Sequence, residues 1–200
     1  MCSWQPRGTR SAIPPLFATM TDLDFCALWA QALSYEEFVK QSTEHCALWT
    51  GVYHLARPPA WALQRACERG QRVRLLVLAE DWCGDASNTI PHVAKLAEQA
   101  HCLEMRMLRR DEHPEVMDRY LTGAARAIPV VIALDDQWHE IGHWGSRPAK
   151  LQAWVMEARK TIPKDQLYPQ VRRWYAKDKG ESTLREILSL LPSTTSGAHQ

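Results

Sequence analysis

The segment Val73–Ala79, with the sequence VRLLVLA, most constrains how this chain can fold. A nearly continuous apolar run of seven residues is typical of a strand that is buried on both faces of a sheet. Helix-like sequence follows from Ser87 to about Gln99, with its apolar residues on one face. A buried strand that leads directly into a helix indicates an α/β fold.

The alternation of strand-like and helix-like sequence continues beyond this first unit. The predicted elements are a strand over Leu103–Leu108, a short helix over Pro114–Leu121, a strand over Pro129–Leu134, a strand over Trp138–Ile141 after a turn at 135–137, and a helix from Pro148 to about Lys160. The order β-α-β-α-β-β-α predicts a central mixed sheet between helices, with a parallel start and a hairpin end.

Helical sequence flanks this α/β region on both sides. In the first flank, Ser34 and Glu37 form a capping-box pattern that predicts a helix running to about Trp49. The predicted organisation is a tail over 1–20, a helical N-terminal extension over 21–70, the α/β domain over 71–161, C-terminal helices packed on it over 162–192, and a flexible tail over 193–200. The first tail is either disordered or precedes a working start at Met20.

Charge and length exclude several classes of function. The 200 residues include 24 Lys and Arg and 23 Asp and Glu, for a net charge of +1. Such a balance produces no overall field to hold a phosphate backbone or an anionic lipid surface, so we expect neither nucleic acid nor membrane as a partner. No apolar run is long enough for a transmembrane helix, and the N-terminus lacks the apolar core of a secretory signal.

The six cysteines indicate a reducing compartment. They stand at positions 2, 26, 46, 67, 83 and 102, at least 16 residues apart, with no C-x-x-C pair. Scattered cysteines differ from the dense patterns of secreted disulfide scaffolds. We therefore expect a cytoplasmic protein in which most cysteines are small buried apolar residues.

The main candidate for chemistry is Cys83, in the sequence Trp82-Cys83-Gly84-Asp85-Ala86 between the buried strand and the next helix. At a helix N-terminus, unpaired N–H groups and the helix dipole favour a thiolate. Thiolates are the nucleophiles of disulfide exchange. The alternative is a packed cysteine with a purely structural role.

Residues 73–160 resemble the thioredoxin family at several points in register. Trp82-Cys83-Gly84 is similar to the start of the family's W-C-G-x-C motif, and Pro91 lies where thioredoxin helices carry a kinking proline. The segment Arg126-Ala127-Ile128-Pro129 resembles R-G-I-P, whose proline is cis and faces the active-site cysteine. Gly142 resembles the glycine that lines the family's substrate groove, and Asp111-to-Pro114 resembles the D-x-x-P after its second core strand. The whole pattern is most similar to a bacterial thioredoxin-like branch.

The resemblance implies a thioredoxin-like fold and a thiol-based oxidoreductase. Cys83 would be catalytic and form a mixed disulfide with a protein or with glutathione, which an external thiol would resolve. Glutathione would be a co-substrate, with no other cofactor and no metal. The substrate-binding residues would be Trp82 and Trp144 as walls of a groove, Gly84, Asp85, and Ile128 and Pro129 as backbone partners of an extended strand.

Departures from the family pattern favour a second interpretation, a redox-inactive thioredoxin-fold binding or adaptor module. Ala86 stands in place of the second cysteine, and Val77 in place of the buried acid. Asp85 replaces a proline, and its charge should raise the pKa of Cys83, as should Glu80 and Asp81.

Among the cysteines that could resolve a mixed disulfide at Cys83, only Cys102 is excluded. Cys102 follows the helix after Cys83, and thirteen helical residues span roughly 20 Å. The Cα atoms of a disulfide lie within about 7 Å of each other. Cys26, Cys46 and Cys67 remain open as partners.

The residues His139-Glu140-Ile141-Gly142-His143 match the H-E-x-x-H pattern of zinc proteases. That pattern binds zinc on a helix, where residues i and i+4 share a face. Here it falls on a predicted strand, where the two histidines are separated by roughly 13 Å. We therefore expect no metalloprotease site.

Overall fold

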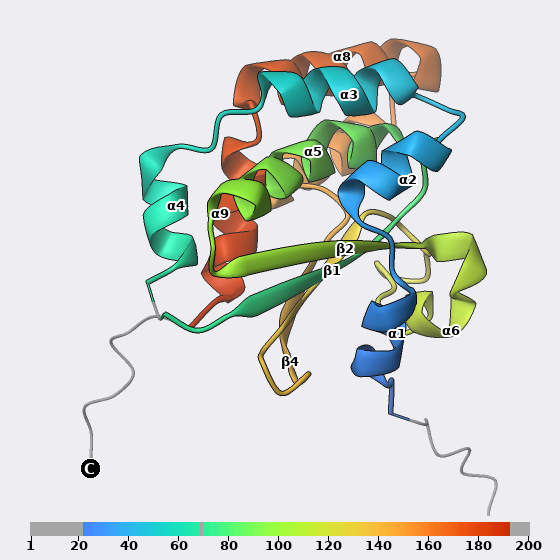
Figure 1. Ribbon diagram of the computed structural model, residues 1–200. Helices are drawn as coiled ribbons and strands as arrows, with labels where there is room; N and C mark the ends of the chain where they lie inside the picture. The colour runs from blue at the N-terminus through green and yellow to red at the C-terminus, as the bar shows by residue number, and fades with distance from the viewer. Residues whose placement is uncertain (1–21, 69, 193–200) are drawn as a thin grey trace, which may run out of the picture.

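The computed structural model describes residues 22–68 and 70–192 (Figure 1). The predicted tails 1–20 and 193–200 lie outside the described residues. The chain forms a four-stranded sheet in the order β2-β1-β3-β4. The strands are β1 (Val73–Ala79), β2 (Leu103–Arg109), β3 (Val130–Leu134) and β4 (Glu140–Gly145). The predicted α/β fold with a central mixed sheet is confirmed.

Strand pairing also follows the prediction of a parallel start and a hairpin end. β1 pairs parallel with β2 and antiparallel with β3, and β3 pairs antiparallel with β4. The last strand begins two residues later than predicted. The Asp135 carboxylate accepts the N–H groups of Gln137 and His139, and Trp138 has a left-handed φ of 69°. These contacts lengthen the turn and delay the strand.

Helices cover both faces of the sheet. Figure 1 shows α5 crossing one face beneath α3, while α1 and α6 lie on the opposite side. The helices are α1 (Phe25–Gln31), α2 (Tyr35–Gln41), α3 (Cys46–Leu55), α4 (Ala60–Ala66), α5 (Gly84–Gln99), α6 (Pro114–Met117), α7 (Ala149–Ala158), α8 (Lys164–Asp178) and α9 (Glu181–Leu190), with a 3-10 turn η1 over Arg110–Glu112. Among the described helices, none is long and apolar enough to cross a membrane.

The N-terminal extension contains two helices where one was predicted from Ser34 to Trp49. The predicted capping box is confirmed, since Ser34 and Glu37 exchange hydrogen bonds of 2.8 and 3.2 Å. The helix ends at Gln41 because the carboxylate of the distant Asp81 accepts the N–H groups of Thr43 and Glu44. These bonds hold the chain in a turn between α2 and α3.

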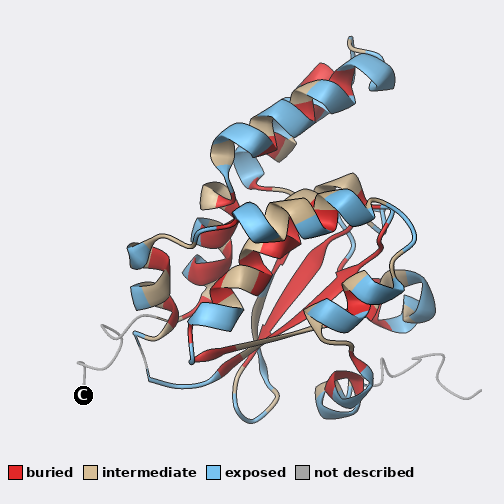
Figure 2. Ribbon diagram, turned by 45° about the horizontal axis from the view of Figure 1, so that its top comes forward, coloured by how far each residue is buried: buried red, intermediate tan, exposed pale blue. Residues whose placement is uncertain are grey.

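The buried residues divide into two apolar clusters of unequal size. The larger one surrounds the sheet, whose strands are the main buried elements in Figure 2. Phe38 and Trp49 of the extension are fully buried in this core, so the extension is part of the same packed unit. The smaller cluster joins α7 and α8 through Leu151, Val155 and Leu167. α8 therefore packs on α7 and not on the core around the sheet.

Candidate functional site

Cys83 lies at the junction of strand and helix that its sequence position predicts. Its N–H donates to the carbonyl of Glu80 in the turn after β1, and the residue forms the N-cap of α5. The sulfur accepts the N–H of Ala86 at 3.4 Å, and the thiol donates to the Ile128 carbonyl at 3.4 Å. Only 7% of Cys83 is exposed. The thiol is thus enclosed between the start of α5 and the loop before β3.

This enclosure decides the protonation state of Cys83. Burial raises the pKa of the thiol to about 11, the Ala86 N–H opposes that rise, and the negative charge of Asp85 adds to it. The thiolate-favouring effect of the helix N-terminus is therefore outweighed by desolvation. At pH 7 only about one molecule in 10⁴ carries the thiolate, against about 3% for a free thiol.

Asp85 raises the pKa of Cys83 as expected, but it also has a structural role that the sequence did not indicate. Its carboxylate accepts Arg147 Nε at 2.9 Å and the hydroxyl of Tyr175 at 2.8 Å. Both the carboxylate and the guanidinium are mostly buried. Because Tyr175 lies on α8 and Asp85 on α5, this cluster holds α8 against the α/β domain.

The other two acids near Cys83 are directed away from it. Glu80 accepts the N–H of Asp111 at 2.8 Å, and burial raises its own pKa. Burial also acts to raise the pKa of Asp81, but the N–H bonds from Thr43 and Glu44 outweigh it and leave that pKa below its ordinary value. Of the three acids expected to raise the pKa of Cys83, only Asp85 does so, and burial is the larger cause.

A groove of about 450 Å³ opens beside Cys83. Five of the predicted site residues line it together: Trp82, Cys83, Gly84, Asp85 and Ile128. Trp82 is 43% exposed, and the guanidinium carbon of Arg110 lies 4.9 Å from the centre of its ring. This side of the groove therefore offers an accessible aromatic face beside a positive charge.

The remaining predicted site residues do not line the groove. Pro129 is buried, and the peptide bond that joins it to Ile128 is cis. Trp144 is buried in β4 and donates its Nε1–H to Glu186 of α9 at 2.6 Å, so it braces that helix. Gly142 faces Leu190 of α9.

Gly145, which sequence reasoning missed, is the glycine that lies close to the loop before β3. A Cβ atom at this position would lie 2.5 Å from the carbonyl oxygen of Pro129. Such a contact is far shorter than packed atoms tolerate. Gly145 therefore allows β4 to approach the chain segment that carries Ile128.

The C-terminal helix α8 supplies a side of the groove that sequence reasoning also missed. Tyr168, Val171, Arg172 and Tyr175 line it. Their spacing of three, four and seven residues is the mark of one helix face, and this pattern was visible in the sequence. Four arginines line the groove against one carboxylate, that of Asp85: Arg110, Arg126, Arg147 and Arg172.

Among the described cysteines, Cys83 is the one that lines the groove. Ala86 occupies the family's second cysteine position and is fully buried. Cys67 and Cys102 form a disulfide, while Cys26 and Cys46 are free and exposed. The expectation that most cysteines are buried is wrong for the described part of the chain, because Cys26 and Cys46 lie on outer helix faces and Cys67 is only partly covered.

The H-E-x-x-H segment is extended, as predicted. His143 Nδ1 lies 2.9 Å from Glu140, and His139 Nδ1 lies 3.3 Å from Asp135. Each histidine is thus paired with a different carboxylate. His139 immediately precedes β4, and His143 lies within it. This arrangement does not present the two rings to one ion.

A family model described as thioredoxin matches residues 32–160. The chain belongs to the thioredoxin family. The match begins at the end of α1 and includes α2 to α4, so the thioredoxin-family region covers most of the helical extension as well as the sheet.

Solved structures show the same thioredoxin-like fold at low sequence identity. A Pseudomonas aeruginosa protein described as of unknown function is 17% identical, with a TM-score of 0.69 over 84% of this chain and 97% of that one. An HIV epitope scaffold is 17% identical, with a TM-score of 0.63 over 83% and 96%. A comparison with curated proteins finds no match.

Proposed function

We propose that this thioredoxin-family protein is a redox-inactive binding module, whose groove takes an extended acidic segment of a partner protein in the cytoplasm. The observation that carries the proposal is the state of Cys83. Its thiol is buried, donates to the Ile128 carbonyl, and has a pKa raised to about 11 by burial. A protonated, enclosed thiol without a neighbouring cysteine is a poor nucleophile but a good packing residue.

The charge of the groove supports an acidic ligand. Arg147 pairs with Asp85, the single carboxylate of the lining. Arg110 and Arg126 pair with Asp111 and Asp118, which lie outside the lining. Among the described residues, Arg172 pairs with no carboxylate, so it is the arginine of the groove that is left for an acidic ligand. Arg172 is exposed, so its guanidinium group is accessible to a ligand, whereas the exposed Arg126 donates two hydrogen bonds to Asp118. Guanidinium groups bind carboxylates through paired hydrogen bonds, which gives direction as well as attraction.

The backbone next to Cys83 supports a ligand in extended conformation. Within residues 22–68 and 70–192, no group accepts a hydrogen bond from the Ile128 N–H. Ile128 also lines the groove, two residues before β3 begins. A strand lying along this segment would pair with that donor and place alternate side chains toward Trp82 and the arginines.

Charge reversal at the groove tests the proposal. We expect a fluorescently labelled peptide rich in Asp and Glu to bind the wild type, and the matched Asn and Gln peptide to bind at least about tenfold more weakly. Arg172→Glu should weaken the binding of the acidic peptide by a similar factor. Arg173→Glu is the matched control, because it makes the same charge change on α8 but does not line the groove. Equal effects of the two substitutions on fluorescence anisotropy titrations would contradict the proposal.

A second candidate is the single-cysteine oxidoreductase that forms a mixed disulfide with a protein or with glutathione. The bond from the Ala86 N–H to Cys83 Sγ favours it, because the same bond would stabilise a thiolate once Cys83 is deprotonated. Insulin reduction with glutathione supplied separates the two candidates. Turnover that Cys83→Ser abolishes would establish the oxidoreductase and overturn the binding module. We expect no turnover above that of the Cys83→Ser variant.

A further inference from the structure

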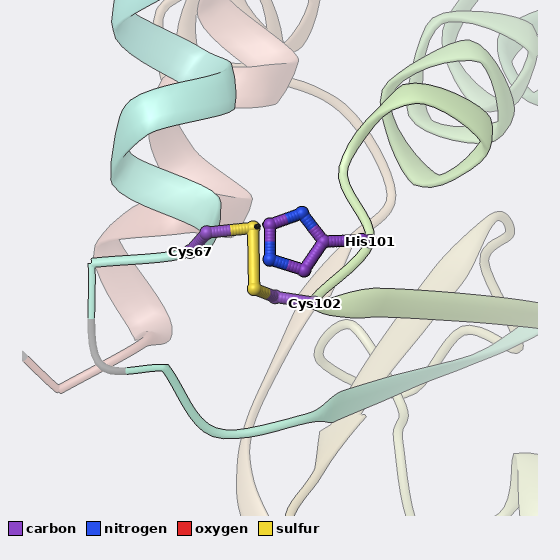
Figure 3. The surroundings of a disulfide bond; sticks show 3 residues. All are labelled: Cys67, His101 and Cys102. Carbon is purple, nitrogen blue, oxygen red and sulfur yellow. Dashed lines mark hydrogen bonds between the residues drawn. A yellow bond between two sulfur atoms is a disulfide. The ribbon is translucent and has the colours of Figure 1, made fainter.

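A second group of sulfur and nitrogen ligands lies at the other end of α5 from Cys83. Figure 3 shows Cys67 at the end of α4 facing His101 and Cys102 in the turn between α5 and β2. The cysteines form a disulfide with their Cα atoms 5.2 Å apart. His101 Nδ1 lies 3.9 Å from Cys67 Sγ, and the three ligand atoms all lie within 4.8 Å of one another.

We propose that, when this disulfide is reduced, Cys67, His101 and Cys102 together bind one Zn²⁺ ion. Two thiolates and an imidazole are ligands that zinc prefers. Tetrahedral zinc with bonds of about 2.3 Å to sulfur and 2.0–2.1 Å to nitrogen places its ligand atoms about 3.6–3.8 Å apart. The observed separations approach that spacing, so rotation of the side chains is sufficient to complete the site.

The backbone holds both cysteines in place independently of the disulfide. The Cys102 carbonyl accepts the N–H of Val73 at 2.9 Å, which joins the start of β1 to the start of β2. The Cys67 carbonyl accepts the N–H of Gly70 at 3.0 Å. Reduction breaks only the bond between the sulfur atoms and leaves these contacts, so the two thiolates remain neighbours.

Exposure differs among the three ligands in a way that suits an open metal site. Cys102 is buried, Cys67 is half-buried and His101 is exposed. A metal ion here would therefore have protein on one side and solvent on the other, with its fourth position available to water. Among the described residues, this is the one group of three or more His, Cys, Asp and Glu side chains that lies close enough to hold a metal ion.

Oxidation and zinc binding exclude each other at this site. A low-molecular-weight disulfide is the class of oxidant that returns the site to the disulfide form. Each cysteine thiolate gives up one electron as the Cys67–Cys102 bond forms, and the S–S bond of the oxidant breaks to give two small thiolates. Zn²⁺ then leaves, since its two sulfur ligands no longer carry charge. The site is thus zinc-bound when reduced and empty when oxidised.

Cobalt titration of the reduced full-length protein tests the proposal, with Co²⁺ as the spectroscopic substitute for Zn²⁺. We expect one equivalent to give the visible bands of a tetrahedral site with thiolate-to-cobalt charge transfer, and Zn²⁺ to displace it. Cys67→Ser should remove about half of the charge-transfer intensity, and His101→Ala should weaken binding at least about tenfold. His101 is exposed, so its substitution leaves the fold intact.

Cys46→Ser is the matched control, because Cys46 is a free exposed cysteine at the start of another helix. It should leave the cobalt spectrum unchanged. The proposal is overturned if the reduced protein gives no tetrahedral spectrum, or if the spectrum is lost in Cys46→Ser and retained in Cys67→Ser. It is also overturned if an excess of oxidised glutathione fails to release zinc to a chromophoric chelator.

Discussion

Asp85→Asn is expected to destabilise the protein by about 3 kcal/mol, because it leaves the mostly buried guanidinium of Arg147 without its counter-charge. The amide still accepts the hydroxyl of Tyr175, so the packing of α8 is preserved while the charge is lost. The same change should lower the pKa of Cys83, since the carboxylate that raises it is removed and Arg147 remains. Urea denaturation and the alkylation rate of Cys83 measure the two effects.

Asp111→Asn is the control for Asp85→Asn. Asp111 also pairs with an arginine, Arg110, but its side chain is 60% exposed. Exposed pairs contribute little, and we expect a loss below about 1 kcal/mol with no change in the reactivity of Cys83. Equal stability of the two variants, or slower alkylation in Asp85→Asn, would show that the Asp85 cluster does not have the role assigned to it.

Gly145→Ala is expected to destabilise the protein by about 2–3 kcal/mol through overpacking. The added Cβ would lie 2.5 Å from the carbonyl oxygen of Pro129 and 3.2 Å from the Cα of Val130. Both are backbone atoms, so relief requires a shift of β4 away from β3 and of the loop that carries Ile128. Thermal unfolding followed by circular dichroism measures the loss.

Gly142→Ala is the matched substitution in the same strand. Its Cβ would meet only the side chain of Leu190, at 3.4 Å or more, which is ordinary van der Waals contact. We expect a change within about 0.5 kcal/mol, since surface and loosely packed positions tolerate an added methyl group. A melting temperature lowered equally by both substitutions would mean that the contact with Pro129 is not the cause.

The fold could be predicted from local patterns because each strand contains its own signal. Val73–Ala79 is an apolar run interrupted only by Arg74, and its predicted bounds are the observed ones. The break between α2 and α3 could not be predicted, because the carboxylate that fixes it belongs to Asp81, 37 residues beyond Glu44. A contact at that separation leaves no mark in the local sequence.

The lining of the groove could be predicted where the family motif specifies it, and not where it depends on packing. Trp82, Cys83 and Gly84 were found from the family motif, and all three line the groove. The high pKa of Cys83 depends on burial by residues from other segments, which no local pattern reports. The pairing of Cys67 with Cys102, 35 residues apart, likewise results from the meeting of α4 with the turn before β2.

The pH dependence of alkylation at Cys83 in the wild type, read by mass spectrometry, tests the central claim most directly. The exposed cysteines Cys26 and Cys46 in the same molecule are internal references. Burial raises the pKa of Cys83 to about 11, so labelling should rise with a midpoint near that pH and should be far slower than at the references at pH 7. A midpoint below the free-thiol value of about 8.5, with labelling faster than at Cys46, would contradict a resting thiol and indicate a working nucleophile.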